Sequence, residues 1–115
     1  MRAHNMHRYY EHHAYYRIHH KELTEKSRRE KGRRAFEYLL KHPCVDCGET
    51  DPIVLEFDHR DGEEKDRAVA ELISDNCGWA KILAEIKKCD VRCANCHRRK
   101  TAHKHRYARS TFLID

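Results

Sequence analysis

The sequence predicts an α+β fold in which a four-cysteine zinc site holds a small core together and a basic helical N-terminal arm precedes it. Two Cys-x-x-Cys pairs have the spacing of structural zinc ligands. Between them, one β-branched and aromatic segment has the composition of a strand, and two others show the apolar spacing of helices. Only 39% of the 115 residues are hydrophobic, so a bound metal is expected to supplement a thin core.

The composition gives no sign of a membrane or secreted protein. No apolar run approaches the length of a transmembrane helix, and the N-terminus lacks the apolar segment of a signal peptide. We therefore expect a cytoplasmic location and no membrane partner. In that reducing compartment, paired cysteines are expected to bind zinc instead of forming disulfides.

The charge is unevenly distributed, although the net charge of +5 already suggests an anionic partner such as DNA. Residues 1–42 hold eleven Lys and Arg against five Glu. Residues 46–66 hold nine acidic side chains against two basic ones, whereas residues 98–109 hold six basic side chains and no acidic one. An acidic cluster beside a basic cluster is what a site needs to hold a divalent metal against a phosphate.

Residues 1–42 are predicted to form the helical arm, since they contain no Pro and a single Gly. We expect a break near residues 23–27, where Thr24 would cap a second helix. An apolar stripe on that second helix should dock on the following domain, and it comprises Ala35, Phe36, Leu39 and Leu40. In the first twenty residues, aromatic and basic side chains are interleaved, which suits contacts with nucleic acid. A solvated helix is the equally weighted alternative.

The predicted domain spans residues 43–109, and residues 110–115 form a short tail. Cys44 and Cys47 lie in a turn where Gly48 eases the approach of two thiolates to one ion. Residues 53–59 are predicted to form a strand because they are β-branched and aromatic. This strand would present Asp58 and His59 at its end.

Two short helices are predicted next, over residues 66–74 and 79–88, with a break between them. Their inward-facing side chains are expected to be Ala68, Val69, Leu72 and Ile73 in the first helix, and Trp79, Ile82, Leu83 and Ile86 in the second. Residues 89–92 could form a second strand, and the last helix should begin near Asn95 and run to about Arg106. Cys77 and Cys89 have no matching partner, so we expect them to be buried as small hydrophobic side chains.

The two cysteine pairs are expected to bind one zinc ion per chain. The predicted ligands are Cys44, Cys47, Cys93 and Cys96. Four thiolates leave no open position on the ion, so its role would be structural. It would fix the strand that carries His59 against the helix that carries His97. His97 could instead replace one cysteine, but its position directly after Cys96 makes that geometry awkward.

A second metal site is predicted from Asp58 and His97. The Asp58 carboxylate can bind a hard divalent ion, and His97 could complete the site while leaving positions open for water and phosphate oxygens. The imidazole of His59, on the other side of the strand, could take a proton from water. Taken alone, the Asp58-His59 dipeptide is more commonly a surface pair.

Four cations follow His97 on the last helix. They are Arg98, Arg99, Lys100 and Lys104, and no acidic residue is interspersed among them. We expect them to contact phosphates that flank the site, with a solvated basic face as the alternative. Asn95 and Lys65 are candidates for a supporting contact.

Three segments together resemble the HNH endonucleases, specifically the small zinc-containing type of phages and bacteria. They are Cys44-x-x-Cys47, Leu55-Glu-Phe-Asp-His59 and Cys93-Ala-Asn-Cys-His-Arg-Arg-Lys100. The resemblance covers about residues 43–105. It implies a ββα-metal fold, hydrolysis of DNA phosphodiesters to 5′-phosphate and 3′-hydroxyl ends, and a location in a bacterium or a phage-infected host cell.

The resemblance also implies roles for individual residues. His59 would be the general base that activates water, and Asp58 and His97 would hold Mg²⁺, Mn²⁺ or a similar ion at the scissile phosphate. The chain departs from the family pattern in one respect, because residues 88–92 lack the middle Asn that braces the loop of the base. Asn95 and Asn76 are the candidates to replace it.

Two alternatives come from other functional classes. The chain could be a zinc-containing DNA-binding module without cleavage activity, which the missing Asn favours. It could also be an accessory module of larger phage packaging or restriction machinery, in which the basic arm contacts protein instead of DNA.

Overall fold

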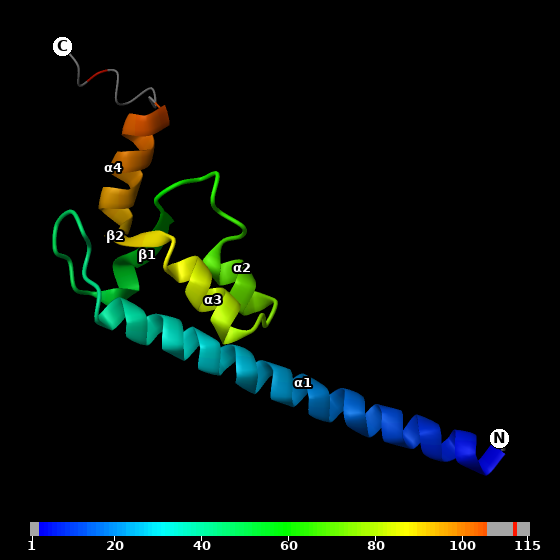
Figure 1. The fold of residues 1–115 in the computed structure, drawn as a ribbon. Helices are drawn as coiled ribbons and strands as arrows, with labels where there is room; N and C mark the ends of the chain where they lie inside the picture. Colours follow the sequence, from blue (N-terminus) through cyan, green and yellow to red (C-terminus); the bar gives the residue numbers. More distant parts are fainter. Residues whose placement is uncertain (1–2, 106–111, 113–115) are drawn as a thin grey trace.

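The computed structural model describes residues 3–105 and residue 112 (Figure 1). Its elements are α1 (Ala3–Leu40), the 3-10 turn η1 (Pro52–Val54), β1 (Leu55–His59), α2 (Val69–Ser74), α3 (Trp79–Ile86), β2 (Cys89–Cys93) and α4 (Ala94–His105). The predicted α+β class is confirmed, with a sheet of two antiparallel strands. The predicted helix end near Arg106, the domain end at residues 106–109 and the tail, apart from Phe112, lie outside the described residues.

Helix α1 is a single rod whose N-terminal part projects beyond the other elements (Figure 1). The predicted break near residues 23–27 is wrong, because the helix runs through it without interruption. Thr24 caps no second helix, since its hydroxyl donates a hydrogen bond of 2.8 Å to the carbonyl of His20 one turn earlier. Despite the length of α1, none of the helices in the described part of the chain is apolar enough to cross a membrane.

The last turns of α1 dock on the remaining elements. Ala35 is buried, and Tyr38 and Leu39 are partly buried against the core. The predicted stripe is wrong in part, because Phe36 and Leu40 face solvent with 41% and 55% of their surface exposed. Positions 35, 38 and 39 are three or four residues apart and share one helix face. Positions 36 and 40 each follow one of these residues and are turned from it by about 100° around the helix axis.

Strands β1 and β2 pair antiparallel over their full lengths. The opposed residues are Leu55 and Cys93, Glu56 and Arg92, Phe57 and Val91, Asp58 and Asp90, and His59 and Cys89. The predicted second strand is confirmed and extends one residue further. The predicted first strand is too long by two residues, because Ile53 and Val54 belong to η1. Asp51 caps that turn by accepting a hydrogen bond of 2.9 Å from the Ile53 amide.

Helices α2 and α3 supply most of the apolar core. Leu72 of α2 and Ile82 and Ile86 of α3 are fully buried, and burial of each contributes roughly 1.5–3 kcal/mol. The predicted inward faces are therefore confirmed at these positions. Helix α2 begins later than predicted, at Val69, because the backbone of Ala68 is still extended.

The turn between α2 and α3 is fastened to α1. Asn76 adopts a left-handed φ of 54°, which Asn tolerates better than most residues. Its side-chain oxygen accepts a hydrogen bond of 2.8 Å from Lys31, and the Ser74 carbonyl accepts one of 3.3 Å from Arg28. Asn76 therefore serves this turn, and its side chain is directed to α1.

The buried side chains form two clusters. The aliphatic cluster consists of Ala35, Val69, Leu72, Ile82, Ile86 and Cys89, and the cysteine cluster consists of Cys44, Leu55, Val91, Cys93 and Cys96. Phe57 and Tyr38 pack against both clusters, with their ring centres 5.9 Å apart. Cys89 is buried as predicted, and burial raises the pKa of its thiol to about 11. Cys77 is only partly buried against the aliphatic cluster.

Candidate functional site

The four predicted zinc ligands converge on one point between the first cysteine turn, the end of β2 and the start of α4. The Sγ atoms of Cys44, Cys47, Cys93 and Cys96 all lie within 4.8 Å of one another, and those of Cys47 and Cys93 are 3.7 Å apart. Tetrahedral zinc with Zn–S bonds of about 2.3 Å places its sulfur ligands roughly 3.8 Å apart. The group could therefore hold a metal ion such as zinc.

Local backbone structure explains how each cysteine pair reaches this point. In the first pair, the Gly48 amide donates a hydrogen bond of 2.9 Å to the Cys44 carbonyl, and Gly48 adopts the positive φ of 77° that closes the turn. In the second pair, Cys93 ends β2 and the Cys96 amide, in the first turn of α4, lies 3.4 Å from the Cys93 Sγ. Both pairs thus present their thiols from tight turns.

The four thiols influence one another's protonation. Burial tends to raise the pKa of Cys44, but hydrogen bonds from the backbone near Cys93, Cys47 and Asp46 outweigh it and lower the pKa to about 6. The hydrogen bond with Cys93, together with burial, raises the pKa of Cys96 to about 12. Neighbouring thiolates repel one another, so all four can ionise together only when a positive ion lies between them.

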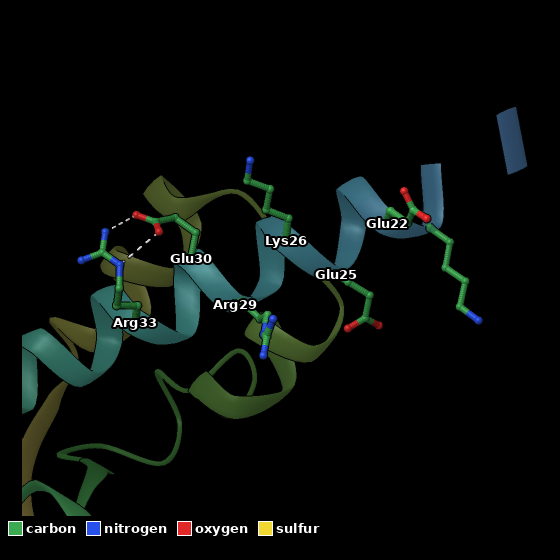
Figure 2. Close-up of a pocket in the computed structure, with 7 residues that line it drawn as sticks. Glu22, Glu25, Lys26, Arg29, Glu30 and Arg33 are labelled. Atoms are coloured by element: carbon green, nitrogen blue, oxygen red, sulfur yellow. Dashed lines mark hydrogen bonds and ion pairs between the residues drawn. The ribbon is translucent and has the colours of Figure 1, made fainter. Parts of the chain in front are cut away.

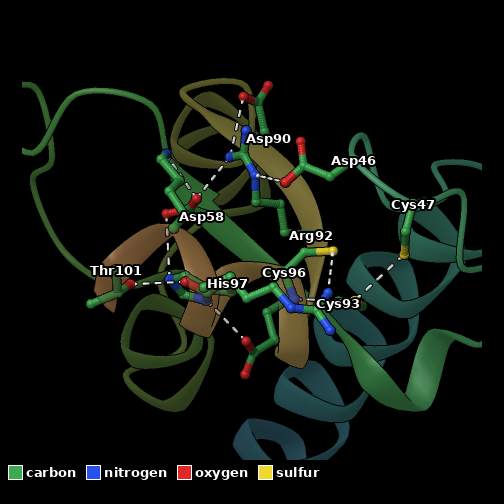
Figure 3. A network of polar contacts seen from close by, with 12 residues as sticks. Asp46, Cys47, Asp58, Asp90, Arg92, Cys93, Cys96, His97 and Thr101 are labelled. Atoms are coloured by element: carbon green, nitrogen blue, oxygen red, sulfur yellow. Dashed lines mark hydrogen bonds and ion pairs between the residues drawn. The ribbon is translucent and has the colours of Figure 1, made fainter. Parts of the chain in front are cut away.

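Asp58 and His97 are brought together, as predicted, on the face of β1 that α4 covers (Figure 3). The Asp58 Oδ1 lies 3.4 Å from the His97 Nε2. The other oxygen, Oδ2, accepts hydrogen bonds of 2.8 Å from Arg92 and 3.0 Å from Lys100. Burial tends to raise the pKa of Asp58, but the hydrogen bonds from Lys100 and Arg92 outweigh it, so the pKa is lowered and the carboxylate is ionised at neutral pH.

Glu56 is a further member of this group that the sequence reasoning missed. Its Oε1 lies 2.9 Å from the His97 Nδ1. When Nδ1 donates its proton to Glu56, the lone pair of Nε2 faces Asp58, which is the carboxylate–histidine arrangement common around metal ions. The available signal was the spacing of Glu56 and Asp58, because alternate residues of a strand share a face.

Arg92 connects the cysteine turn with Asp58 (Figure 3). Its Nε donates a hydrogen bond of 2.8 Å to Asp46, which lies between the first two cysteines, and its Nη1 donates one of 2.8 Å to Asp58. Asp90 lies 3.5 Å from the same Nη1. Only 12% of the Arg92 side chain is exposed, so the connection is largely shielded from solvent.

His59 lies on the opposite side of β1 from Asp58, as the alternation of a strand requires. Its Nε2 is 2.6 Å from the Oε2 of Glu85 in α3, and 10% of the His59 side chain is exposed. Burial tends to raise the pKa of Glu85, but hydrogen bonds from Lys88, His59 and the Asp66 amide outweigh it and lower the pKa to about 2. Glu85 was not among the residues predicted for the site, because a charged side chain is rarely buried.

The two predicted supporting residues are exposed. Asn95 lies on the outer side of the first turn of α4, and Lys65 lies in the loop between β1 and α2. Within the described part of the chain, neither side chain forms a hydrogen bond or ion pair with Asp58, His59 or His97. The structure therefore does not bring them into the candidate site.

The cations of α4 fall into two groups. Lys100 is half-buried and bound to Asp58. Arg98, Arg99 and Lys104 are exposed and form no ion pair with a carboxylate among the described residues. Two surface hollows flank the helix, and Arg98 lines the one that contains Glu56 and His97, whereas Arg99 and Lys104 line the other, beside Asp46 and Cys47.

A third hollow lies along α1 and does not resemble a catalytic site (Figure 2). Its lining consists of charged side chains from that one helix. Glu30 accepts a hydrogen bond of 3.1 Å from Arg33, which lowers the pKa of Glu30. Cations and carboxylates here compensate one another, and the lining contains neither His nor Cys.

The described residues therefore contain a four-cysteine group, an acid–histidine group next to it and a buried carboxylate that holds a second histidine. Comparison with protein-family models, with curated proteins and with solved structures finds no match for the chain. The resemblance to HNH endonucleases accordingly rests on the residues and geometry given above and stays a prediction.

Proposed function

We propose that this protein is a zinc-containing, metal-dependent endonuclease of the HNH type that hydrolyses phosphodiester bonds in DNA. The observation that carries the proposal is the proximity of the Asp58 Oδ1 and the His97 Nε2, 3.4 Å apart, on a β1–β2–α4 unit closed by four cysteines. Two antiparallel strands followed by a helix are the elements that a ββα-metal fold requires.

Zinc is the proposed occupant of the cysteine group. Its four sulfur ligands would complete the coordination shell, so the ion would stabilise the fold and take no part in hydrolysis. Because Cys93 and Cys96 flank the start of α4, the ion would also fix the direction in which His97 leaves the sheet. We expect one zinc ion per chain.

The second ion would be held by Asp58 and His97, with Glu56 orienting the His97 ring. A divalent ion such as Mg²⁺ or Mn²⁺, when bound there, would polarise the scissile phosphate and stabilise the charge that develops during hydrolysis. Arg92 and Lys100 would keep Asp58 ionised and correctly placed through its other oxygen.

His59 would act as the general base for a phosphate bound at the end of β1, where Asp58 and His59 are the last two residues of the strand. Its imidazole takes a proton from a water molecule, whose oxygen forms a bond to phosphorus while the bond from phosphorus to the 3′ oxygen breaks. The departing oxygen takes a proton from solvent. Arg98, Arg99 and Lys104 would bind neighbouring phosphates, since they are exposed and form no ion pair among the described residues. The expectation for Lys100 changes, because this side chain is directed to Asp58.

Plasmid cleavage tests the proposal. Supercoiled DNA is incubated with the protein and Mg²⁺, Mn²⁺ or Ni²⁺, with EDTA as a control, and nicked and linear products are measured. We expect His59→Ala to abolish cleavage, while the matched variant His42→Ala, at an exposed histidine after α1, retains it. Unchanged nicking in the His59→Ala protein would remove His59 from its assigned role.

A DNA-binding module without cleavage activity is the second candidate. It is favoured by the two cations that already neutralise the Asp58 Oδ2, because a group compensated in this way needs no metal ion. Salt-sensitive DNA binding without cleavage in any of the three divalent ions would select it. A place in larger phage or restriction machinery stays a prediction, and a co-purifying protein together with absent DNA affinity would support it.

A further inference from the structure

Glu85 carries a charged side chain and is buried, with 3% of its surface exposed. A carboxylate is removed from water at a cost of several kcal/mol unless hydrogen bonds compensate it. Its Oε2 lies 2.6 Å from the His59 Nε2 and 3.1 Å from the Asp66 amide, and its Oε1 accepts a hydrogen bond of 2.9 Å from Lys88. His59 ends β1, Asp66 lies in the segment that follows it, and Lys88 reaches that segment.

These contacts fasten the loop at residues 60–68 to the junction of α3 and β2. Lys88 bonds to Glu85 and also donates a hydrogen bond of 3.0 Å to the Glu64 carbonyl in the middle of the loop. At the start of the loop, the Arg60 amide donates to the Lys88 carbonyl at 3.1 Å. The loop directly after His59 is therefore anchored at its beginning, its middle and, through Asp66, near its end.

The same contacts define the state of the His59 ring. A carboxylate only accepts hydrogen bonds when ionised, so the 2.6 Å contact requires the proton on Nε2 of His59. In the described part of the chain, every side-chain nitrogen or oxygen shielded from solvent has a hydrogen-bond partner. The His59 Nδ1 has no partner among those hydrogen bonds, so this atom is not fully shielded from solvent. A neutral ring thus presents a lone pair at Nδ1 to water.

We propose that Glu85 is a positioning residue for His59, which holds the ring with its Nε2 proton toward α3 and its Nδ1 lone pair toward the attacking water. This inference rests on the proposed function and assigns the work of the family's middle Asn to a carboxylate on a helix. Asn76 is directed to Lys31 and Asn95 is exposed on α4, so neither holds the loop of His59.

A purely structural role would give Glu85 a different signature. If it served only as a buried partner of Lys88, its replacement would lower stability and leave the His59 ring and the catalytic rate of the folded protein unchanged. If it positions His59, an isosteric change that preserves folding still alters the tautomer of His59 and the rate. The two roles are therefore separable in a protein that remains folded.

The test compares the wild-type chain with Glu85→Gln, Glu85→Leu and the matched control Glu71→Gln, at an exposed carboxylate of α2. Zinc content and far-UV circular dichroism establish that each protein is folded. Long-range ¹H–¹⁵N NMR of the His59 ring reports its tautomer, and single-turnover cleavage at saturating DNA reports the chemical step apart from DNA affinity.

We expect the wild-type ring to carry its proton on Nε2, and E85Q to show a mixture of tautomers with cleavage slowed roughly 10–100-fold, at DNA affinity within about twofold of the wild type. E71Q should match the wild type in every readout. A wild-type ring protonated on Nδ1, or an unchanged tautomer and rate in E85Q, would overturn the proposal. If E85L fails to fold, the comparison of E85Q with the wild type still tests the proposal.

The failure of the nuclease proposal gives a different result. If the wild-type protein cleaves no DNA in any metal, the endonuclease assignment is lost, and the His59 tautomer still shows whether Glu85 holds the ring. A change of tautomer in E85Q, with no cleavage by the wild-type protein, would support the contact between Glu85 and His59 and would contradict the nuclease proposal. A change of both tautomer and rate supports the two proposals together.

Discussion

The two buried clusters lie at the two ends of the sheet and are held together differently. The aliphatic cluster, at the end where His59 faces Cys89, contains three fully buried aliphatic side chains. The cysteine cluster, at the opposite end, contains only Leu55 and Val91 besides its thiols, so its cohesion depends on what those thiols bind. Asp58 is tied through Arg92 to the turn of the cysteine cluster, and His59 is tied through Glu85 to α3 of the aliphatic cluster. The candidate site therefore requires both halves.

Removal of the proposed zinc ion should have the largest effect on this arrangement. Structural zinc contributes about 10 kcal/mol or more in small zinc-dependent domains, which equals the whole stability of many proteins. We expect chelation, or Cys93→Ser, to abolish cooperative unfolding. Trp79 is the single tryptophan and packs on the aliphatic cluster, so its fluorescence reports the other half. We expect that signal to be lost as well, because Phe57 and Tyr38 contact both clusters.

The control for this experiment is Cys77→Ser, which changes a cysteine outside the metal group. We expect it to retain zinc and a cooperative transition. Native Trp79 fluorescence in the chelated protein would show that the aliphatic cluster folds without the metal. It would contradict the expectation that the two clusters fold together.

Truncation in the aliphatic cluster should have the next largest effect. Leu72 is fully buried, so Leu72→Ala should lower the free energy of unfolding by about 2–5 kcal/mol through lost burial and the cavity left behind. Urea unfolding followed by Trp79 fluorescence measures it. Ile53→Ala, at a side chain with 80% of its surface exposed, should change the free energy by less than about 0.5 kcal/mol. Equal effects of the two changes would contradict the assignment of this core.

Much of the fold could be predicted from local pattern. The spacing of the cysteine pairs marks the metal group, and apolar periodicity marks Leu72, Ile82 and Ile86 as core, because both signals lie within a few residues of sequence. The proximity of Asp58 and His97 was expected because one zinc ion bound by both cysteine pairs would hold the strand of Asp58 against the helix of His97. The resemblance to a known family assigned both residues to one ion. Neither signal is a local pattern, because each joins residues far apart in the chain.

Glu85 could not be predicted because the relevant information is tertiary. It lies three residues after Ile82 on the inward face of α3, but a charged residue at such a position is usually placed at the surface. Only the arrival of His59 and Lys88 at the same point makes its burial favourable. The error at Thr24 has a different cause, since a Thr can cap a helix or bond back within one, and the sequence does not decide between these.

Acid should reveal how Glu85 stabilises the folded state. Its pKa is about 2 when folded, below the ordinary value of 4.5, so its stabilising effect is present above about pH 4.5 and is lost as the pH falls toward 2. We expect Glu85→Gln to lower the free energy of unfolding by about 2 kcal/mol at pH 7, because its hydrogen bonds lose their charge. The difference from wild type should shrink below about pH 4.5.

Urea titrations of both proteins in zinc-containing buffer, at several pH values, measure that difference. Protonation of the thiolates releases zinc, so the two proteins are compared only at pH values at which both retain the ion and a cooperative transition. A difference that stays constant from pH 7 to the lowest such pH below 4.5 would show that the Glu85 carboxylate is not the source of the stabilisation.

The link between the cysteine turn and Asp58 should contribute less. Arg92→Gln removes the guanidinium that bridges Asp46 and Asp58, but Lys100 still compensates Asp58. We expect a loss of about 1 kcal/mol in the free energy of unfolding. A double-mutant cycle with Asp46→Asn measures the coupling across the bridge, and Lys81→Gln, at an exposed cation of α3, is the control. A coupling of zero would mean that Arg92 does not connect the two regions.

The smallest effect is expected where α1 extends past both clusters. Thr24 lies one turn before Arg28, which contacts Ser74, so its conformation is only weakly coupled to the folded core. In a continuous helix, Thr24→Ala replaces a poor helix former by the best one and should raise far-UV helicity slightly, with a gain below about 0.6 kcal/mol. If Thr24 capped a second helix, the same change would lower helicity at a cost of about 1 kcal/mol. The sign of the change therefore distinguishes the two structures, and Ser27→Ala, one turn further along the same helix, provides the reference for an ordinary interior position.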